Sequence, residues 1–202
     1  MNNLRNNLRN NLRTYRHNLL TTGLLALALT TPAVQADGSF IALLGGTTES
    51  ADMDSSGTSW RLLFGPRATD NLSFEMGLMD LGEARNTISG ANNSGISRFH
   101  PQGGLFSLSY RFGVLEQLDL FVKGGFNLWY ADFDRVSIDA SNVRTEEQDS
   151  VSGVSMITGA GLMWWVLPDL AVRVELETTE LESREFPNTR FQLLTLGVQY
   201  DF

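Results

Sequence analysis

Leu193-Leu194-Thr195-Leu196-Gly197-Val198-Gln199-Tyr200-Asp201-Phe202, the last ten residues of the chain, alternate between two kinds of side chain. Successive side chains of a strand point to opposite faces. Leu194, Leu196, Val198, Tyr200 and Phe202 therefore share one face, and Leu193, Thr195, Gly197, Gln199 and Asp201 share the other. The first face suits lipid and the second suits a crowded interior, a division typical of a strand in a transmembrane β-barrel.

The same alternation recurs upstream in two strong segments and five weaker ones. Residues 118–130 keep it for thirteen positions, and residues 170–178 place Arg173, Glu175 and Glu177 on one face. The weaker segments are residues 39–46, 59–65, 72–81, 105–112 and 156–166. Together with the last segment they predict eight strands, and an even number is usual for bacterial single-chain barrels.

The predicted connections between these strands alternate in length. Three are short, at residues 66–71, 113–117 and 167–169. The other four are longer and polar, at residues 47–57, 82–103, 132–153 and 179–189. Short periplasmic turns and longer outer loops are the usual asymmetry of outer-membrane barrels. The sequence therefore predicts an all-β fold, an eight-stranded antiparallel up-and-down transmembrane β-barrel with both mature termini in the periplasm.

The amino-terminal segment has the composition of a secretory signal. Four arginines precede an apolar run at residues 19–29, and Val34-Gln35-Ala36 resembles a cleavage site. We expect residues 1–36 to be a cleaved signal peptide and residues 37–202 to be the barrel domain. The apolar run is short for a membrane helix, and a retained helical anchor is the alternative. The tandem repeat Asn-Asn-Leu-Arg lengthens the basic region, and we assign it no role in the folded product.

Composition narrows the function classes further. Removal of the leader leaves 11 basic and 23 acidic residues, with Lys123 the only lysine, so that the net charge is −12 and nucleic acid is not expected as a partner. The chain contains no cysteine, which excludes disulfides and thiolate metal sites. The remaining residues suffice for one domain. We expect no cofactor and no metal ligands.

A soluble periplasmic β-sandwich is the alternative fold. Two features favour the barrel instead. Aromatic residues cluster near the predicted strand ends, where their rings would lie at the two membrane interfaces: Trp60, Phe64, Tyr110, Phe112, Tyr130, Trp164, Tyr200 and Phe202. The carboxyl-terminal Phe202, preceded by Tyr200 and Val198, resembles the signal that the outer-membrane insertion machinery reads. Closure into a barrel also satisfies every backbone polar group within hydrocarbon.

Several segments resemble the transmembrane domain of the OmpA family, an eight-stranded barrel. They are Leu-Ser-Phe-Glu-Met-Gly at residues 72–77 with Asp-Leu-Gly at 80–82, Leu-Asp-Leu at 118–120 continuing through Gly124-Gly125 to Trp129, Ala131 and Asp132, Arg-Val-Glu-Leu at 173–176, and Leu-Gly-Val-Gln-Tyr at 196–200. The likeness covers most of residues 58–202. The peptidoglycan-binding domain that often follows this barrel is not expected, because the sequence stops at Phe202.

This resemblance implies particular contacts inside the lumen. In the family a glutamate of the third strand pairs with an arginine of the seventh, and these match Glu75 and Arg173. Arg111 on the fourth strand matches a second basic lumen residue. The acidic residue of the sixth strand falls on Met163 in this chain, so the family's arrangement is incomplete, and Glu175 is the residue that would compensate.

Charged side chains on the inward faces must largely neutralise one another. Eight strands enclose a lumen that side chains fill, and unpaired charge there is costly. The inward charges are Arg61, Glu75, Arg111, Asp119, Lys123, Arg173, Glu175 and Glu177. The sequence predicts a lumen ion-pair network of Glu75, Arg173, Arg111, Lys123, Glu175 and Arg61 that acts as a structural plug. Rearrangement of these pairs would instead open a narrow ion path.

Enzymatic chemistry is not expected. Small barrels that act on lipids use serine and histidine, but the only histidine after the leader is His100, in the second predicted loop, without a serine or acid at a recognisable nucleophile spacing. We interpret His100 as a surface or loop-packing residue. The glycine-rich segments Gly45-Gly46, Gly103-Gly104 and Gly159-Ala160-Gly161 are better explained by close strand packing and curvature than by phosphate binding.

The third predicted loop, residues 132–153, is strongly acidic. It carries six acidic residues against Arg135 and Arg144, so we expect it to remain solvated. Carboxylate oxygens suit calcium and magnesium. One hypothesis is that they bind divalent cations that also bridge lipopolysaccharide phosphates.

The sequence as a whole predicts an integral protein of the cell outer membrane. We expect a structural role in envelope integrity, with surface loops for adhesion or interaction. The alternative is a narrow porin-like channel for ions or small solutes, gated by the lumen ion pairs. The expected partners are outer-membrane lipid, lipopolysaccharide and the insertion machinery, with host surfaces or phage at the loops, and we expect a monomer.

Overall fold

The computed structural model describes residues 38–50, 57–90, 93–139, 144–183 and 186–202. The predicted signal peptide lies outside these residues. In chain order the strands are β1 (Ser39–Ser50), β2 (Gly57–Pro66), β3 (Leu72–Asp80), β4 (Ala84–Gly90), β5 (Asn93–Leu115), β6 (Leu118–Asp139), β7 (Arg144–Leu167), β8 (Leu170–Ser183) and β9 (Phe186–Asp201). Within the described ranges, no helix has the length and apolar character needed to cross a membrane.

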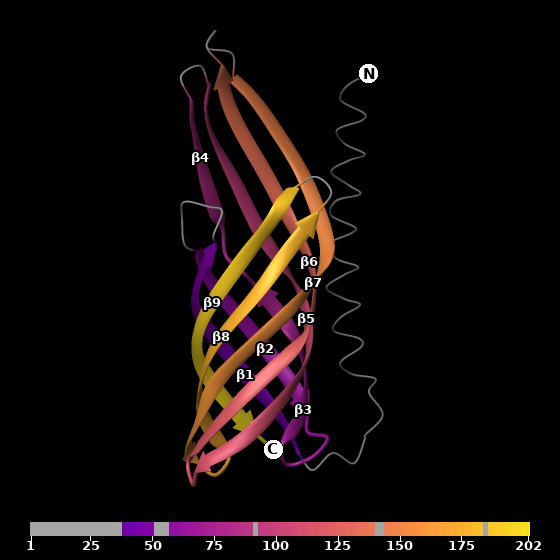
Figure 1. Ribbon diagram of the computed structural model, residues 1–202, viewed down its shortest axis with the longest axis vertical. Coiled ribbons are helices and arrows are strands. Elements are labelled where there is room, and N and C mark those ends of the chain that lie inside the picture. Colours follow the sequence, from indigo (N-terminus) through magenta and orange to yellow (C-terminus); the bar gives the residue numbers. More distant parts are fainter. Residues whose placement is uncertain (1–37, 51–56, 91–92, 140–143, 184–185) are drawn as a thin grey trace. The chain divides into compact units, whose positions relative to one another are not determined.

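The strands form one antiparallel sheet that closes on itself (Figure 1). The hydrogen-bonded order runs β3-β2-β1-β9-β8-β7-β6-β5-β4, and a further pairing of β3 with β5 closes the ring. β1 pairs with β9 from Phe40–Asp201 to Ser50–Phe191, so the first and last strands are neighbours. The predicted ring of eight antiparallel strands is confirmed, with β4 as an additional strand beside β5.

β4 resumes the path of β3 after a break that residues 81–83 form. The break lies opposite Pro101 of β5, which has no N–H to donate to a neighbouring strand. The register slips by one residue between the Asp80–Gln102 and Ala84–Phe99 pairs. Gly82 has a positive φ of 78° and its N–H donates to the Asp80 carboxylate at 2.7 Å. This turn bends the wall without opening it, because the Leu81 N–H still donates to the Pro101 carbonyl at 3.0 Å.

The strands extend well beyond their predicted ends, and the predicted loop boundaries are wrong. Most of residues 82–103 and 132–153 belong to β4, β5, β6 and β7, which continue past the other strands (Figure 1). The β5–β6 ladder runs to Asn93–Asp139 and the β6–β7 ladder to Ile138–Arg144. Alternation is weak there because side chains on both faces of this sheet meet water. We call this four-stranded part the extension, and the opposite end, with the three short connections, the turn end.

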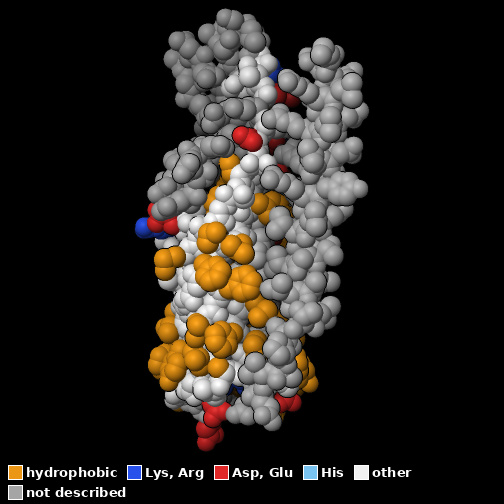
Figure 2. Space-filling view, turned by 90° about the vertical axis from the view of Figure 1, so that its right-hand side faces the viewer, with side chains coloured by type: hydrophobic (Ala, Val, Ile, Leu, Met, Phe, Trp, Pro, Cys, Tyr) orange, Lys and Arg blue, Asp and Glu red, His pale blue; other side chains and the backbone are white. Residues whose placement is uncertain are grey.

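Exposed apolar side chains of the ring strands form a belt below the extension, and Figure 2 shows one face of it. The outward residues that sequence alternation predicted are exposed; examples are Leu120, Val122, Leu196, Val198 and Tyr200. Their neighbours along each strand, such as Phe121, Lys123 and Thr195, are buried inside the ring. The two faces of each strand are therefore assigned as the sequence predicted.

Two inward phenylalanines fill space that glycines leave on neighbouring strands. A Cβ at Gly161 would lie 2.4 Å from the Phe121 ring, and a Cβ at Gly65 would lie 2.2 Å from the Phe40 ring. The interpretation of glycines as close-packing positions is supported here. Glycine at these two positions therefore leaves room for each ring beside the wall of the lumen near the turn end.

Candidate functional site: the lumen ion cluster

Six charged side chains meet inside the barrel at the level of the apolar belt. Three are cations and three are anions, so the formal charges cancel, and each side chain is at most 1% exposed. The members come from β2, β3, β6 and β8: Arg61, Glu75, Lys123, Arg173, Glu175 and Glu177. We call this group the ion cluster. Period-two alternation on β8 places three of its members on one inner face.

Glu175 is the centre of the ion cluster because it contacts all three cations. Its Oε2 lies 2.8 Å from Lys123 Nζ and 3.2 Å from Arg61 Nη1, and its Oε1 pairs with Arg173 Nε. Glu177 pairs with both Arg61 and Lys123. Buried charges of this kind are tolerated only when each finds partners, and every member here has at least two.

Arg173 connects the ion cluster to the aromatic layer beneath it. Its Nη2 donates to Glu75 Oε1 at 2.6 Å, and its Nη1 donates to Gln199 Oε1 at 2.9 Å. The guanidinium carbon lies 4.5 Å from the centre of the Phe121 ring and 5.9 Å from that of Phe40. Such contacts stabilise a buried arginine through the negative faces of the rings. Arg173 is therefore fixed from several directions.

A second ionic group closes the lumen at the turn end. Arg67 pairs with Asp201, and Arg111 Nε lies 3.5 Å from Asp119 Oδ2. Trp165 stands between them: its Nε1 donates to Asp119 at 2.7 Å, and both guanidinium groups lie within 6 Å of its ring centre. We call these five residues the turn-end cluster.

Gln199 joins the two clusters. Its Oε1 accepts from Arg173, and its Nε2 donates to Asp201 Oδ1 at 2.8 Å. A continuous line of polar contacts thus runs from Glu75 to Arg67. A change of ion pairing in one cluster would therefore disturb the hydrogen bond of Gln199 to the other cluster.

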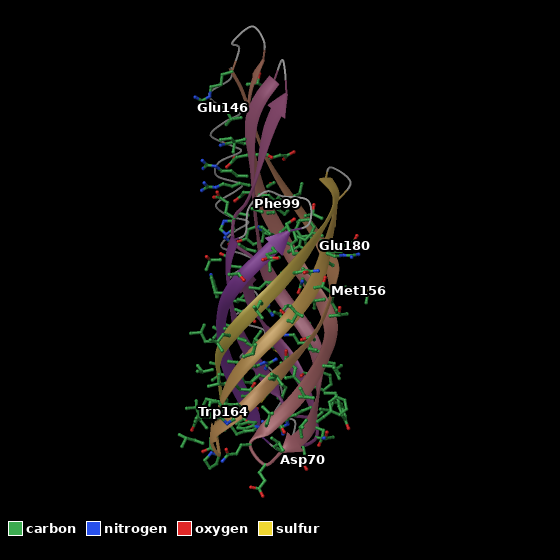
Figure 3. All side chains as sticks on the ribbon, turned by 60° about the vertical axis from the view of Figure 1, so that its left-hand side comes forward. Asp70, Phe99, Glu146, Met156, Trp164 and Glu180 are labelled. Atoms are coloured by element: carbon green, nitrogen blue, oxygen red, sulfur yellow. The ribbon has the colours of Figure 1, made fainter. Side chains whose placement is uncertain are left out.

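An apolar layer closes the lumen on the opposite side of the ion cluster. Phe99 packs edge-on against Trp129 and stacks on Phe191, with ring centres 6.3 Å apart in both cases. Further buried apolar side chains surround these rings: Leu81, Ala84, Leu105, Ala131, Val151, Leu181 and Leu193. This layer, which we call the apolar cap, lies where the barrel meets the extension. Figure 3 places Phe99 between Met156 and Glu146, above the belt.

The structure groups the predicted network residues in two places. Glu75, Arg173, Lys123, Glu175 and Arg61 lie in the ion cluster, whereas Arg111 lies in the turn-end cluster with Asp119. The reason is position along the strand: Arg111 is close to the end of β5, four residues beyond Ser107, whose hydroxyl donates to Glu75.

Some members of these clusters were missed in the sequence. The predicted network lacks Glu177, although alternation on β8 places this side chain inward, where it pairs with Arg61 and Lys123. Arg67 gave no such signal, because it follows β2 in a predicted turn and reaches Asp201 across the sheet. Met163 packs with Phe121 and Ala171, and Glu175 occupies the role expected of a compensating acid.

The carboxyl-terminal residues lie on the lipid-facing side of the last strand. Val198, Tyr200 and Phe202 are all about half exposed or more, and the Tyr200 and Phe202 rings stack. The Phe202 N–H and C=O both pair with Ser39, which completes the junction of β9 with β1. Their reading by the insertion machinery stays a prediction.

His100 lies on β5 and not in a loop, which corrects the predicted placement. Its Nε2 is 2.9 Å from Asp80 Oδ1, and Gln102 approaches the same ring. The acidic segment after Ala131 is also largely strand. Among the side chains that the structure describes, no group of three or more could hold a metal ion. Glu147 and Asp139, two of the acids invoked for cation binding, lie outside the described side chains.

The closed antiparallel ring, the apolar belt and the charged lumen define an outer-membrane β-barrel. The sequence matches the OmpA-like transmembrane domain over residues 34–202, and the chain belongs to that family. It is 30% identical over 134 residues to outer membrane protein A of Klebsiella pneumoniae, covering 65% of this chain and 37% of that protein. It is 26% identical over 141 residues to outer membrane protein P5 of Haemophilus influenzae, covering 65% and 39%.

A solved structure supports the fold. The amino-terminal β-barrel domain of Pseudomonas aeruginosa OprF superposes with a TM-score of 0.54 at 14% sequence identity, covering 82% of this chain and 100% of that one. The chain spans little more than a third of the length of outer membrane protein A from Klebsiella pneumoniae. The relatives are outer-membrane proteins, and the protein is located in the outer membrane of a Gram-negative cell. The turn end is accordingly periplasmic and the extension extracellular.

Proposed function

We propose that the protein is a structural component of the outer membrane that supports envelope integrity and presents its extension to partners outside the cell. The observation that carries this proposal is the closure of the lumen. The ion cluster, the turn-end cluster and the apolar cap block it at three levels, and the ion cluster has no net charge. A barrel filled in this way suits a rigid membrane element better than an open pore.

Interaction with other surfaces is the second half of this proposal. The extension carries backbone and polar side chains beyond the belt, where host surfaces, phage or other envelope components approach. Outer-membrane lipid, lipopolysaccharide and the insertion machinery are the partners that a monomeric barrel would meet in its own membrane. Removal of residues 85–98 together with 133–150 should abolish surface binding while the barrel still folds.

Conductance in planar lipid bilayers tests the structural role. The purified protein should give no stable single-channel current, and Glu75→Ala should not create a selective one. Steady, ion-selective openings that Glu75→Ala alters would overturn the proposal. Folding of each sample is verified beforehand by the difference in gel mobility between unboiled and boiled protein.

The alternative is a narrow channel gated by the ion cluster. What favours it is the polar lining of the lumen next to the ion cluster, where Asn127, Ser155 and Thr179 are buried side chains. Conduction would require the pairs of Glu75 and Arg173 to exchange and the apolar cap to open as well. A variant with a smaller cap, Phe99→Ala, should then conduct more than the parent protein.

We further propose that the protein has no catalytic role and that residues 1–36 are removed on export. What supports the first part is that the matched family and relatives are named as outer-membrane proteins and not as enzymes. In the described region the side chain of His100 contacts Asp80 and Gln102, so these contacts include no serine hydroxyl that the imidazole could activate. Amino-terminal sequencing of protein extracted from outer membranes should begin at Asp37.

A further inference from the structure

β7 and β8 separate where the barrel meets the extension. Their ladder begins at Ile157–Thr179 and runs from there to the turn end. Beyond it β7 continues upward with β6 alone, and β8 continues to Ser183 with β9 alone (Figure 1). In the described parts of the chain, no strand pairs with the outer edge of β7 over residues 144–156. We call this the free edge.

The direction of the backbone groups on the free edge follows from one hydrogen bond. The Thr179 hydroxyl donates to the Met156 carbonyl at 2.9 Å, so that carbonyl points toward β8. In a strand, the N–H and C=O of one residue point to the same side, and alternate residues share that side. Val154, Ser152 and Ser150 therefore direct their backbone groups to the free edge.

Ser150 provides independent support for this assignment. Its N–H donates to the Asp149 carboxylate at 2.8 Å. A backbone N–H that was already engaged in the ladder with β6 would not take this local partner. Asp149 thus covers one end of the free edge, a common way in which natural proteins protect an unpaired strand.

The side chains around the free edge are acidic at one end and apolar at the other. Residues 144–156 contain three acids and one arginine. Glu146 and Asp149 are exposed on β7, where Glu146 pairs with Arg144 at 2.6 Å. Glu180 lies on β8 across the separation and pairs with Arg190 at 3.5 Å. Val154 and Met156 are 63% and 74% exposed on the outer face near the belt. Figure 3 shows Met156 and Glu180 at similar height, with Glu146 near the tip.

We propose that the free edge binds an extended cationic segment of another protein by strand addition. Backbone groups of Ser152 and Val154 would form the new ladder, and the incoming segment would displace the Asp149 carboxylate from the Ser150 N–H. By strand alternation, an apolar side chain of the segment would cover Val154 and Met156 on the outer face, while lysine or arginine side chains on the opposite face would meet Asp149. Main-chain bonds provide affinity in this mode and alternate side chains provide specificity.

Charge decides which occupant the free edge favours. A second copy of this chain would bring the same acidic edge, and like charges repel across a strand pair. A cationic segment would instead be attracted by the acidic side chains of the free edge. The proposal gives the interaction role of the proposed function a site, but it does not depend on whether the barrel conducts or supports the envelope.

The test measures binding of the peptide acetyl-Lys-Val-Lys-Val-Lys-Val-Lys-amide to protein extracted from outer membranes and placed in zwitterionic nanodiscs. Amide NMR signals of Ser150, Ser152 and Val154 should shift on saturation. Ser152→Pro removes one N–H from the free edge. It removes no hydrogen bond to β6, because the Ser152 N–H points toward the free edge and away from β6. It should weaken binding about tenfold or more, whereas Ser152→Ala should bind like the parent protein.

A second arm leaves the protein unchanged. The same peptide with N-methylated valines keeps its charge but loses ladder donors, and it should bind about tenfold more weakly. Equal binding of the methylated peptide, or equal binding to empty nanodiscs, would reduce the effect to charge attraction and overturn the proposal. Self-association through the free edge, detected as a dimer that Ser152→Pro abolishes, would also overturn it. Conductance plays no part in these readouts, so either proposal can fail alone.

Discussion

The barrel at the level of the belt and the apolar cap at the base of the extension have opposite interiors. At the level of the belt, six charged side chains fill the lumen while apolar side chains face lipid. At the base of the extension, Phe99, Trp129 and Phe191 fill the interior while polar side chains face water. Water drives apolar side chains inward, and lipid supplies no such force. The barrel therefore depends on closure and ion pairs at the level of the belt, and on a conventional apolar core in the apolar cap, where it meets the extension.

The largest expected effect comes from removing the centre of the ion cluster. Glu175→Ala leaves Lys123, Arg61 and Arg173 with too few acids in a buried site, so the free energy of unfolding should fall by about 3–5 kcal/mol. Urea unfolding in lipid vesicles, followed by gel mobility, measures it. Glu180→Ala on the same strand is the control, because Glu180 is 44% exposed and its pair with Arg190 should contribute less than about 1 kcal/mol. If both variants lose the same free energy of unfolding, the barrel does not depend on its buried ion pairs.

The apolar cap should respond differently from the ion cluster. Phe99→Ala removes a ring that contacts Trp129 and Phe191 and should cost about 3–4 kcal/mol, mostly within the extension. Amide hydrogen exchange should accelerate in β4 and the upper part of β5, while the gel mobility of the folded barrel persists. Ile96→Ala, which changes a 47% exposed residue of the same strand, should leave exchange unchanged. Loss of the whole barrel in Phe99→Ala would show that the two interiors form one cooperative unit.

The boundary between the two regions is testable on one strand. Val122 and Val136 both lie on the outward face of β6 by strand alternation, the first exposed in the belt and the second half-buried in the extension. Val122→Arg should destabilise the protein by about 2–4 kcal/mol because it places a charge in lipid. Val136→Arg should change stability by less than about 0.5 kcal/mol, as surface substitutions usually do. Unfolding in vesicles measures both values. If the two variants lose a similar free energy of unfolding, lipid reaches as far as Val136.

The smallest expected effect concerns the contact between Gly161 and the Phe121 ring in the lumen. Gly161→Ala forces a methyl group against the Phe121 ring and should cost about 1–3 kcal/mol. Gly124→Ala is the matched control, since a Cβ there meets no atom within 4 Å. Adding Phe121→Leu to Gly161→Ala should restore part of the stability. No recovery in the double variant would indicate that the Val174 carbonyl, 2.3 Å from the same Cβ, is the obstacle.

Alternation in the sequence was sufficient to predict the ring and its two faces, because lipid outside and a crowded lumen inside impose opposite requirements at every second residue. The same signal placed Arg173, Glu175 and Glu177 inside. It failed where that contrast ends: Arg144 to Ser150 are polar on both faces, so β7 appeared to begin twelve residues later than it does. The break at Gly82 depends on Pro101 of another strand, which local patterns do not show.

The partition of charges into two clusters was likewise not readable from the sequence. It depends on the stagger between strands, which sets the height of each side chain in the lumen. Arg111 and Lys123 are both inward, yet Ser109 and not Arg111 lies opposite Lys123 in the ladder. The family resemblance indicated the Glu75–Arg173 pair, and the structure adds Arg67, Trp165 and Gln199 around it.

Lys123 carries the one primary amine among all the side chains of the chain, and it is enclosed in the ion cluster. Reagents that acylate amines will therefore find only the chain's amino terminus while the barrel is closed. Acylation of Lys123, detected as a second label, therefore reports when the lumen opens. The wild-type sequence thus allows the rate of unfolding to be followed chemically without any substitution.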